Sequence, residues 1–152
     1  MFYTVKNDKI TLTVNSFGAE ITHLIHEGVE RIGQNDNNTW DGHAFTLFPL
    51  CGHSTVVVDG KDYNMPPHGF AYTNEWSLVS QGEDYLTFVL KSNEEIKKIY
   101  PYDFEYYMTY KIDGDTLLIT HEMKNTSNDT ALYFACGGHE SFNVKEDLSI
   151  LD

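Results

Sequence analysis

Arginine is almost absent from this chain: Arg31 is the only one, and the 10 Lys and Arg residues face 23 Asp and Glu residues. With a formal net charge of −13, the sequence lacks the basic footprint that DNA, RNA or an anionic lipid surface attracts. Scarce arginine also disfavours bidentate binding of phosphate groups. We therefore expect no nucleic-acid partner and no membrane partner, and a neutral small molecule fits the charge balance best.

Cysteine and long apolar runs are also scarce. Cys51 and Cys136 are too few for a disulfide scaffold and lack the spacing of a zinc site. No apolar run approaches the length that spans a membrane, and "MFYTVKNDKI" lacks the basic and apolar regions of a signal peptide. We expect a cytoplasmic protein with reduced cysteines, in which residues 1–152 form a single domain.

Short alternating apolar and polar segments are abundant. In "KITLTVNS", residues 10, 12 and 14 are apolar and share one face of a strand, and "AEITHLIHEG" repeats the pattern before a turn at residues 27–28. Asp-Gly pairs at residues 59–60 and 113–114 predict two hairpins, the second joining strands 104–112 and 116–124. Further strands are expected at residues 77–79, 86–91 and 132–137. The pattern predicts an all-β fold, an antiparallel β-sandwich or barrel.

Only one segment is typical of a helix. "SNEEIKKIYP" predicts a short helix near residues 93–99, with Ser92 and Glu95 in capping-box spacing. Lys97 and Lys98 suit its last turn, and Pro101 ends it.

Seven histidines are the main candidates for chemistry. Three lie in segments shaped by proline or glycine: His53 after "FPLCG", His68 in "MPPHGFAY" and His139 in "GGHESFN". Loops of this kind often carry functional side chains, and histidine transfers protons near neutral pH. The other four are expected at the surface or in satisfied structural positions: His23, His26, His43 and His121.

The residues alone leave three explanations for the loop histidines. A three-histidine metal site is disfavoured because no two of them share a strand at i, i+2 spacing, and we predict no metal. Acid–base chemistry on a neutral polar ligand is the second explanation, and simple strand-ending turns are the third and most frequent one. Aromatic residues that could wall a pocket are Trp40, Phe70, Trp76 and Phe142.

Longer stretches resemble a known family. The segments "TLFPLCGHSTVVVDGKDYNMPPHGFAYTNEWSLV" and "TFVLKSNEEIKKIYPYDFEYYMTYKIDGDTLLITHEMKNTSNDTALYFACGGHESFN" are similar to the aldose 1-epimerase (galactose mutarotase-like) family, in particular its LacX-like branch. The family pattern has FPxxGR, HGFAR, a YP-[FY]-x-F strand and G-x-H-P-x-F-N in this order. Each motif is short, but four in register are fairly specific.

The resemblance implies a β-supersandwich that binds sugars in an open cleft and interconverts the α and β anomers of aldoses without a cofactor. A general acid and a general base then act on opposite sides of one C–O bond. His139 matches the family's general acid, and His68 matches the histidine that holds the ring oxygen or a neighbouring hydroxyl. The substrate-binding positions implied by the resemblance are His53, Tyr72, Phe70 and Asn143. Phe70 and Trp76 would be pocket or core aromatics, and the core is the more frequent place for such residues.

Departures from the family pattern qualify this expectation. His53 and Tyr72 replace two arginines, and Glu140 replaces the proline after the acid histidine. The family's general base is a glutamate in the C-terminal half, whereas residues 1–152 correspond to the N-terminal half. We therefore expect a truncated epimerase-like protein that lacks the base and binds a neutral, hexose-like monosaccharide. It would self-associate or pair with a complementary C-terminal half. The alternatives are a non-catalytic carbohydrate-binding or regulatory module and a purely structural β-domain.

Overall fold

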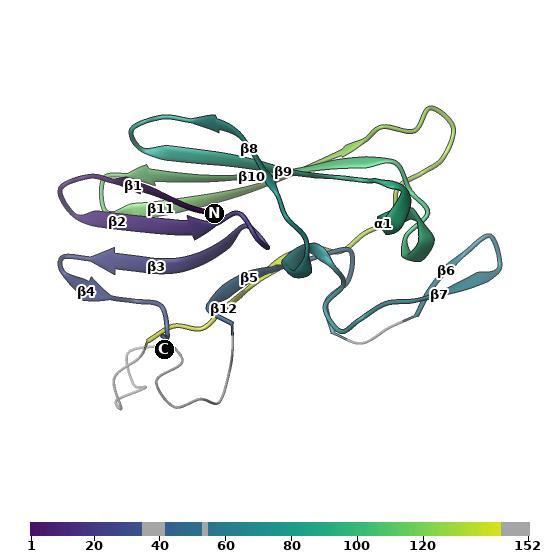
Figure 1. The fold of residues 1–152 in the computed structure, drawn as a ribbon, viewed down its shortest axis with the longest axis horizontal. Helices are drawn as coiled ribbons and strands as arrows, with labels where there is room; N and C mark the ends of the chain where they lie inside the picture. Colours follow the sequence, from purple (N-terminus) through teal and green to yellow (C-terminus); the bar gives the residue numbers. More distant parts are fainter. Residues whose placement is uncertain (35–41, 53–54, 144–152) are drawn as a thin grey trace.

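The computed structural model of the chain describes residues 1–34, 42–52 and 55–143, which form two antiparallel sheets and a projecting hairpin (Figure 1). Every pair of named strands in these ranges is antiparallel. The predicted all-β antiparallel sandwich is therefore confirmed. None of the helices in the described ranges has the length and apolar character needed to cross a membrane.

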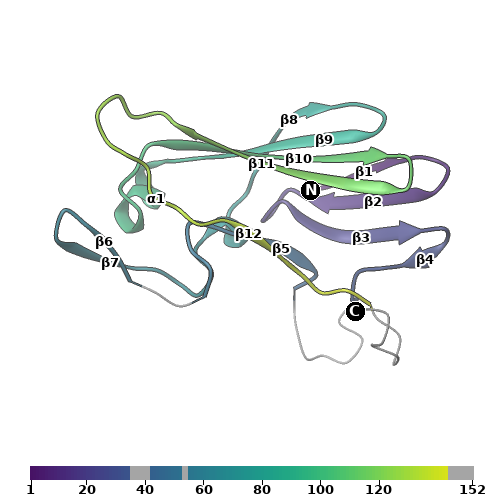
Figure 2. The same cartoon turned by 180° about the vertical axis from the view of Figure 1, so that it is seen from behind.

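The larger sheet has six strands. Five of them follow the order β1-β2-β3-β5-β12, and the sixth, β4, pairs with β3. Its strands are β1 (Phe2–Lys6), β2 (Ile10–Asn15), β3 (Glu20–His26), β4 (Val29–Glu30), β5 (Ala44–Leu47) and β12 (Gly137–Glu140). Figures 1 and 2 show β5 and β12 side by side, although their residues are far apart in the sequence. This pairing brings the predicted acid histidine next to a strand from the first third of the chain.

The smaller sheet has four strands in the order β11-β10-β9-β8. Its strands are β8 (Ser77–Gln81), β9 (Tyr85–Lys91), β10 (Phe104–Asp113) and β11 (Thr116–Asn125). A turn at residues 113–116 joins the two long strands, as the Asp-Gly pair predicts, and Gly114 has the positive φ of 63° that such turns favour. The predicted strands at 77–79 and 86–91 are confirmed within the slightly longer β8 and β9.

The core lies between the two sheets. Along β10, residues 104, 106, 108, 110 and 112 are buried, while the residues between them are partly or fully exposed. The β2 face of Ile10, Leu12 and Val14 is buried opposite them, as the alternation predicts. One apolar cluster contains residues of both sheets, so the sheets form a sandwich around a shared core.

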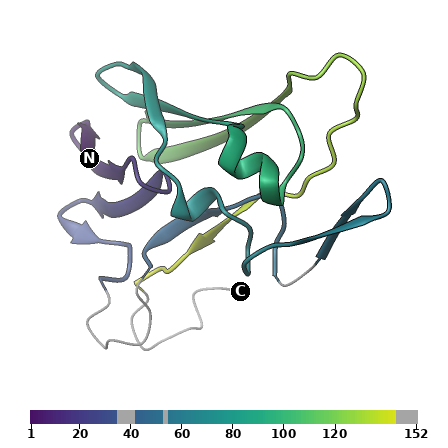
Figure 3. The same ribbon diagram turned by 45° about the vertical axis from the view of Figure 1, so that its right-hand side comes forward.

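The remaining elements lie outside the two sheets. The hairpin β6 (Thr55–Val58) and β7 (Lys61–Asn64) extends away from the sandwich (Figures 1 and 3). Its turn residues Asp59 and Gly60 have φ values of 51° and 75°, which confirms the predicted hairpin turn. A 3-10 turn, η1 (Ala71–Thr73), follows the loop that carries His68.

The short helix α1 (Glu94–Ile99) is confirmed, but the predicted capping residue is wrong. Asn93, not Ser92, caps it: the Asn93 side chain accepts hydrogen bonds from the backbone N–H groups of Glu95 and Ile96. Asn93 is extended and lies one position closer to the first turn, where its short amide side chain reaches those donors. Ser92 instead accepts a hydrogen bond from the Phe104 backbone N–H.

The expected strand at residues 132–137 is also wrong, because only Gly137 belongs to a strand there and β12 continues to Glu140. Gly137 pairs with Leu47, the last residue of β5. Beyond it, the Ala135 N–H donates to the Pro49 carbonyl, but proline has no N–H to complete the ladder. The strand therefore begins later than its apolar sequence predicts, and His139 lies on a strand rather than in a loop.

The strand β11 forms one edge of the smaller sheet, and within the described ranges it pairs only with β10 (Figure 2). Leu117, Ile119 and Met123 face the core side, since their partners in β10 are buried, yet all three remain partly exposed. This edge therefore offers both backbone hydrogen-bonding groups and apolar surface.

Candidate functional site

Two loops, residues 48–52 and 66–71, lie against each other and hold His68. The His68 N–H donates to the Gly52 carbonyl at 2.8 Å, and the Phe48 N–H donates to the His68 carbonyl at 3.2 Å. These two bonds hold the backbone of His68 in place on both its N–H and its carbonyl side, although His68 lies in a loop.

Gly69 makes this close approach possible. It has a φ of +80°, and a Cβ atom placed on it would lie 2.0 Å from the Phe48 carbonyl oxygen. A backbone oxygen at that distance leaves no room for any side chain, so the glycine of "HGF" is required by the packing of the two loops. His68 itself has a φ of 66°, which is uncommon for a residue with a side chain.

A backbone hydrogen bond sets the tautomer of His68. The Gly52 N–H donates to Nδ1 of His68 at 3.0 Å. Because a backbone N–H can only donate, Nδ1 is the acceptor, and the proton of the neutral ring is on Nε2. His68 therefore presents an N–H donor on its outer nitrogen.

His139 lies on β12 directly opposite Phe45 of β5. The two rings stack with their centroids 5.1 Å apart and their planes 16° apart. The His68 ring meets the His139 ring edge-on at 5.4 Å, and the Tyr72 ring lies 4.8 Å from the Phe45 ring. The structure thus gathers His68, His139 and Tyr72, three predicted site residues, around Phe45, and all four side chains are partly exposed.

This cluster lies on the outer face of the six-stranded sheet, away from the core. Ala44 and Thr46, the neighbours of Phe45 on β5, are buried, so Phe45 points to the opposite side. Successive residues of a strand alternate between faces, and Glu140 pairs with the buried Ala44. The carboxylate of Glu140 is therefore on the other face of the sheet from the His139 ring.

Other predicted site residues have different surroundings. Phe70 is 2% exposed and its ring packs against the Phe48 ring at 5.7 Å, so it supports the His68 loop from the core side. Trp76 is also buried, and its Nε1–H donates to the Ala71 carbonyl. His53 and Trp40 lie outside the described residues.

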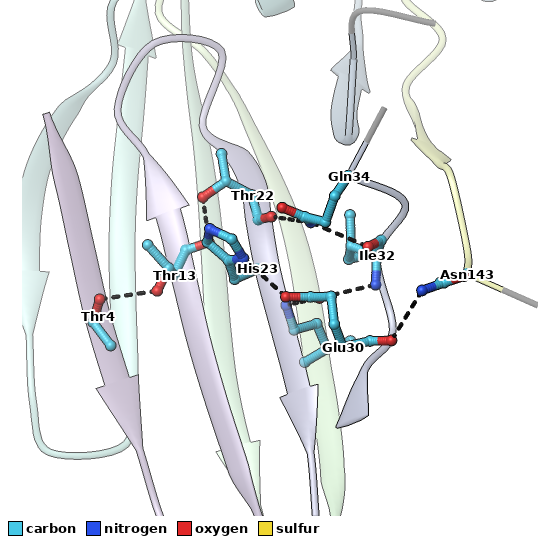
Figure 4. A network of polar contacts seen from close by, with 9 residues as sticks. Thr4, Thr13, Thr22, His23, Glu30, Ile32, Gln34 and Asn143 are labelled. Carbon is cyan, nitrogen blue, oxygen red and sulfur yellow. Dashed lines mark hydrogen bonds and ion pairs between the residues drawn. The ribbon is translucent and has the colours of Figure 1, made fainter. Parts of the chain in front are cut away.

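Asn143 is not brought into the cluster. Its backbone N–H donates to the Arg31 carbonyl at 2.7 Å, and its side chain lies 3.5 Å from the Glu30 carbonyl (Figure 4). Asn143 follows His139 by four positions, which in an extended chain is a span of about 13 Å.

Glu20 and His43 border the cluster, and sequence reasoning missed their relation. Ile21 pairs with Ala44, and extending that antiparallel register by one residue places Glu20 opposite Phe45. The Glu20 carboxylate accepts a hydrogen bond from the His43 backbone N–H at 2.7 Å and lies 3.3 Å from Nδ1 of His43. The alternation of "HAFTL" could have placed His43 and Phe45 on one face, but nothing local pairs β5 with β3.

The other histidines have structural partners, as predicted. His23 lies 2.8 Å from Glu30, and Nδ1 of His121 lies 2.6 Å from the Tyr106 hydroxyl on the core side of the smaller sheet. Burial raises the pKa of Tyr106 above its ordinary value and lowers the pKa of His121. These groups are separate from the outer-face cluster.

A metal centre finds no support in the described ranges. No group of three His, Cys, Asp or Glu side chains there is arranged to hold a metal ion. Cys51 and Cys136 are free thiols.

Known proteins resemble this chain in sequence and in fold. The chromosomal LacX protein of Lactococcus lactis subsp. lactis is 27% identical over 152 residues, which covers 94% of this chain and 51% of LacX. An Escherichia coli K12 protein named as a candidate glucose-6-phosphate 1-epimerase is 36% identical over 139 residues, which covers 85% of this chain and 45% of that protein.

A solved structure has the same fold. The crystal structure of a galactose mutarotase related enzyme from Lactobacillus acidophilus matches with a TM-score of 0.90 and 32% identity, covering 98% of this chain and 51% of that one. The chain thus spans about half the length of these relatives. A family model described as aldose 1-epimerase matches residues 1–152. With this match and the fold in agreement, the chain belongs to the aldose 1-epimerase family.

Proposed function

We propose that the chain is the sugar-binding and proton-donating part of an aldose 1-epimerase, and that it binds an aldose on the outer face of the six-stranded sheet. The observation that carries the proposal is the contact of two imidazoles, His68 and His139, beside the partly exposed side chains of Phe45 and Tyr72. Family membership supports the reaction class.

The chemistry requires a proton donor at the ring oxygen of the sugar. Interconversion of anomers breaks the bond between the anomeric carbon and the ring oxygen, which gains a proton while the anomeric hydroxyl loses one. In this proposal His139 gives the proton to the ring oxygen. The Nε2–H of His68 donates a hydrogen bond to the same oxygen or to the neighbouring hydroxyl.

Charge and shape favour a neutral sugar. Phe45 contacts the rings of His139 and Tyr72, and the part of its side chain that remains exposed offers apolar surface to the C–H groups of a pyranose. Arg31, the only arginine, lies 3.4 Å from His26 at the far end of β3. With no arginine in the described part of the site, binding of a sugar phosphate loses its usual partner.

The proton acceptor is the weaker part of the site. Glu140 follows the acid histidine in sequence, but it lies on the other face of the sheet. The family resemblance implies a glutamate base from the C-terminal half. We propose that turnover by residues 1–152 alone depends on a base from solution, and that further polypeptide supplies the base in an assembled protein.

The open edge of β11 supports such an assembly. Within the described ranges the outer edge of β11 has no partner strand, and with partly exposed Leu117 and Ile119 it is a template for an added strand. We propose that this edge pairs with a complementary C-terminal half or, in its absence, with a second copy of the chain.

Polarimetry tests the proposed activity. The approach of pure α-D-galactose to anomeric equilibrium is followed with the chain, with and without added acetate as an external base. We expect acceleration that increases with acetate and is lost in His139→Ala, whereas His26→Ala retains it. Acceleration that is equal in the chain and in His139→Ala would contradict the assignment of the acid.

A non-catalytic carbohydrate-binding module is the alternative function. The position of Glu140 favours it, together with His53 and Tyr72 in place of the family's two arginines. Saturation-transfer NMR separates the two functions. Binding of galactose without any acceleration, at every acetate concentration, supports the binding module.

A further inference from the structure

Two of the histidines on the outer face present opposite hydrogen-bonding groups. The outer nitrogen of neutral His68 carries a proton, because Nδ1 accepts from the Gly52 N–H. At His43 the arrangement is reversed: Nδ1 lies 3.3 Å from a Glu20 carboxylate oxygen. An ionised carboxylate has no proton to donate, so Nδ1 of His43 carries the proton and the neutral ring leaves its lone pair on Nε2.

The Glu20–His43 pair is well placed beside the aromatic cluster. Glu20 lies opposite Phe45 in the extended register, and Phe45 in turn pairs with His139, so the three form one row across the sheet. Adjacent strands are about 4.8 Å apart, so this row brings Glu20 to one side of Phe45 and His139 to the other. His43 lies two residues before Phe45, about 7 Å along the chain direction.

The pair is also held firmly. Glu20 Oε1 accepts from the backbone N–H of His43 at 2.7 Å, so the carboxylate is fixed by the main chain before it orients the ring. The side chains of His43 and Glu20 are 26% and 18% exposed, which leaves part of the imidazole open to a ligand. A carboxylate that fixes the tautomer of a histidine in this way prepares its other nitrogen for a defined role.

We propose that His43, oriented by Glu20, is a hydrogen-bond acceptor for a hydroxyl of the sugar bound against Phe45. This inference rests on the proposed function and deepens it. His43 would accept a hydrogen bond from one sugar hydroxyl, and His68 would donate one to the ring oxygen. Sugars that keep a hydroxyl at the His43 end are then preferred over the corresponding deoxy sugars.

The same face provides a matched control. Glu30 and His23 form a second carboxylate–imidazole pair, with 2.8 Å between Oε2 and Nδ1 (Figure 4). His23 lies three residues beyond Glu20 on β3, about 10 Å further along the strand. His23→Ala removes a similar pair from the same face without changing the surroundings of Phe45.

Saturation-transfer NMR titrations with D-galactose and D-glucose test the proposal. Loss of one neutral hydrogen bond should weaken binding about 3- to 10-fold in His43→Ala. Glu20→Gln, which keeps an oxygen for the His43 backbone N–H, should weaken it less, and His23→Ala should not change it. Across the monodeoxy series, one analogue should bind the chain and His43→Ala equally, because it lacks the hydroxyl that His43 accepts.

Long-range ¹H–¹⁵N spectra at pH 8 check the tautomers without any ligand. We expect the Nδ1–H form for His43 and the Nε2–H form for His68, and conversion of His43 to a tautomer mixture in Glu20→Gln. The inference alone fails if galactose binding is lost in His139→Ala but unchanged in His43→Ala. It also fails if His43 has the Nε2–H form. If the intact chain neither binds nor converts any of these sugars, the proposed function fails and the inference fails with it.

Discussion

Gly69→Ala should damage the protein much more than the same substitution at Gly60. Both glycines have a positive φ, +80° and +75°, where an alanine is strained by about 1–2 kcal/mol. Nothing lies within 4 Å of a Cβ atom at Gly60, so the strain is the whole cost there. At Gly69 the new Cβ would lie 2.0 Å from the Phe48 carbonyl oxygen, and one of the two loops has to move.

That movement breaks further contacts. The Phe48 carbonyl accepts hydrogen bonds from the N–H groups of Phe70 at 2.9 Å and Ala71 at 3.3 Å. Each contributes about 0.5–1.5 kcal/mol, so Gly69→Ala should lower the free energy of unfolding by about 2–5 kcal/mol in total. With a urea m value of about 2 kcal/mol/M, the midpoint falls by about 1–2.5 M for Gly69→Ala and by about 0.5–1 M for Gly60→Ala.

Urea titrations monitored by tryptophan fluorescence measure both shifts under the same conditions. Gly69→Ala should also weaken galactose binding in the absence of urea, because His68 precedes Gly69 and moves with the loop. If the two variants have equal midpoints and equal affinity for galactose, the close contact between the loops is not the reason for the glycine.

Three further predictions concern pH and association. Burial lowers the pKa of His121, so protonation of this side chain is less favourable in the folded state than in the unfolded state. The urea midpoint of the chain should therefore fall as the pH drops from 7.5 through 6.5 toward 5, and it should fall less in His121→Gln. Hydrogen bonds, first from Lys91 and then from Tyr107 and Lys124, lower the pKa of Glu105 to about 2. The ionised Glu105 carboxylate therefore stabilises the folded state fully above pH 4.5, and this stabilisation is lost as the pH falls through about 2. The difference in urea midpoint between the chain and Glu105→Gln should shrink over that pH range. Leu118→Lys adds a charge to the β11 edge and should shift sedimentation from associated species toward a 17.4 kDa monomer; a sharply melting monomer without the substitution would contradict the open-edge proposal.

The sequence predicts the sheets better than it predicts the site. Alternation at β2 and β10 and the Asp-Gly turns are local signals, and the structure confirms the strands that they predict. The start of β12 was mispredicted because its partner determines it: Pro49 cannot continue the ladder, whatever the β propensity of residues 132–136.

The site depends on pairings between distant segments. His68 and His139 are separated by 70 residues of sequence, and motif resemblance, not periodicity, singled them out together. Phe45 and the Glu20–His43 pair were missed because their relation arises only when β5 pairs with both β3 and β12. The motif of Phe70 is compatible with a place in the pocket or in the core, and its burial places it in the core beneath His68.

In the proposed function, the outer-face cluster carries the acid for sugar ring opening. The most direct measurement is the rate at which α-D-galactose reaches anomeric equilibrium, compared between the chain and His139→Ala in acetate buffer. General acid catalysis contributes about 10²–10⁴-fold when donor and acceptor are both in place, so even a partial site should give a measurable His139-dependent rate. We expect acceleration by the chain and none by His139→Ala. Identical rates, equal to that of buffer alone, would contradict it.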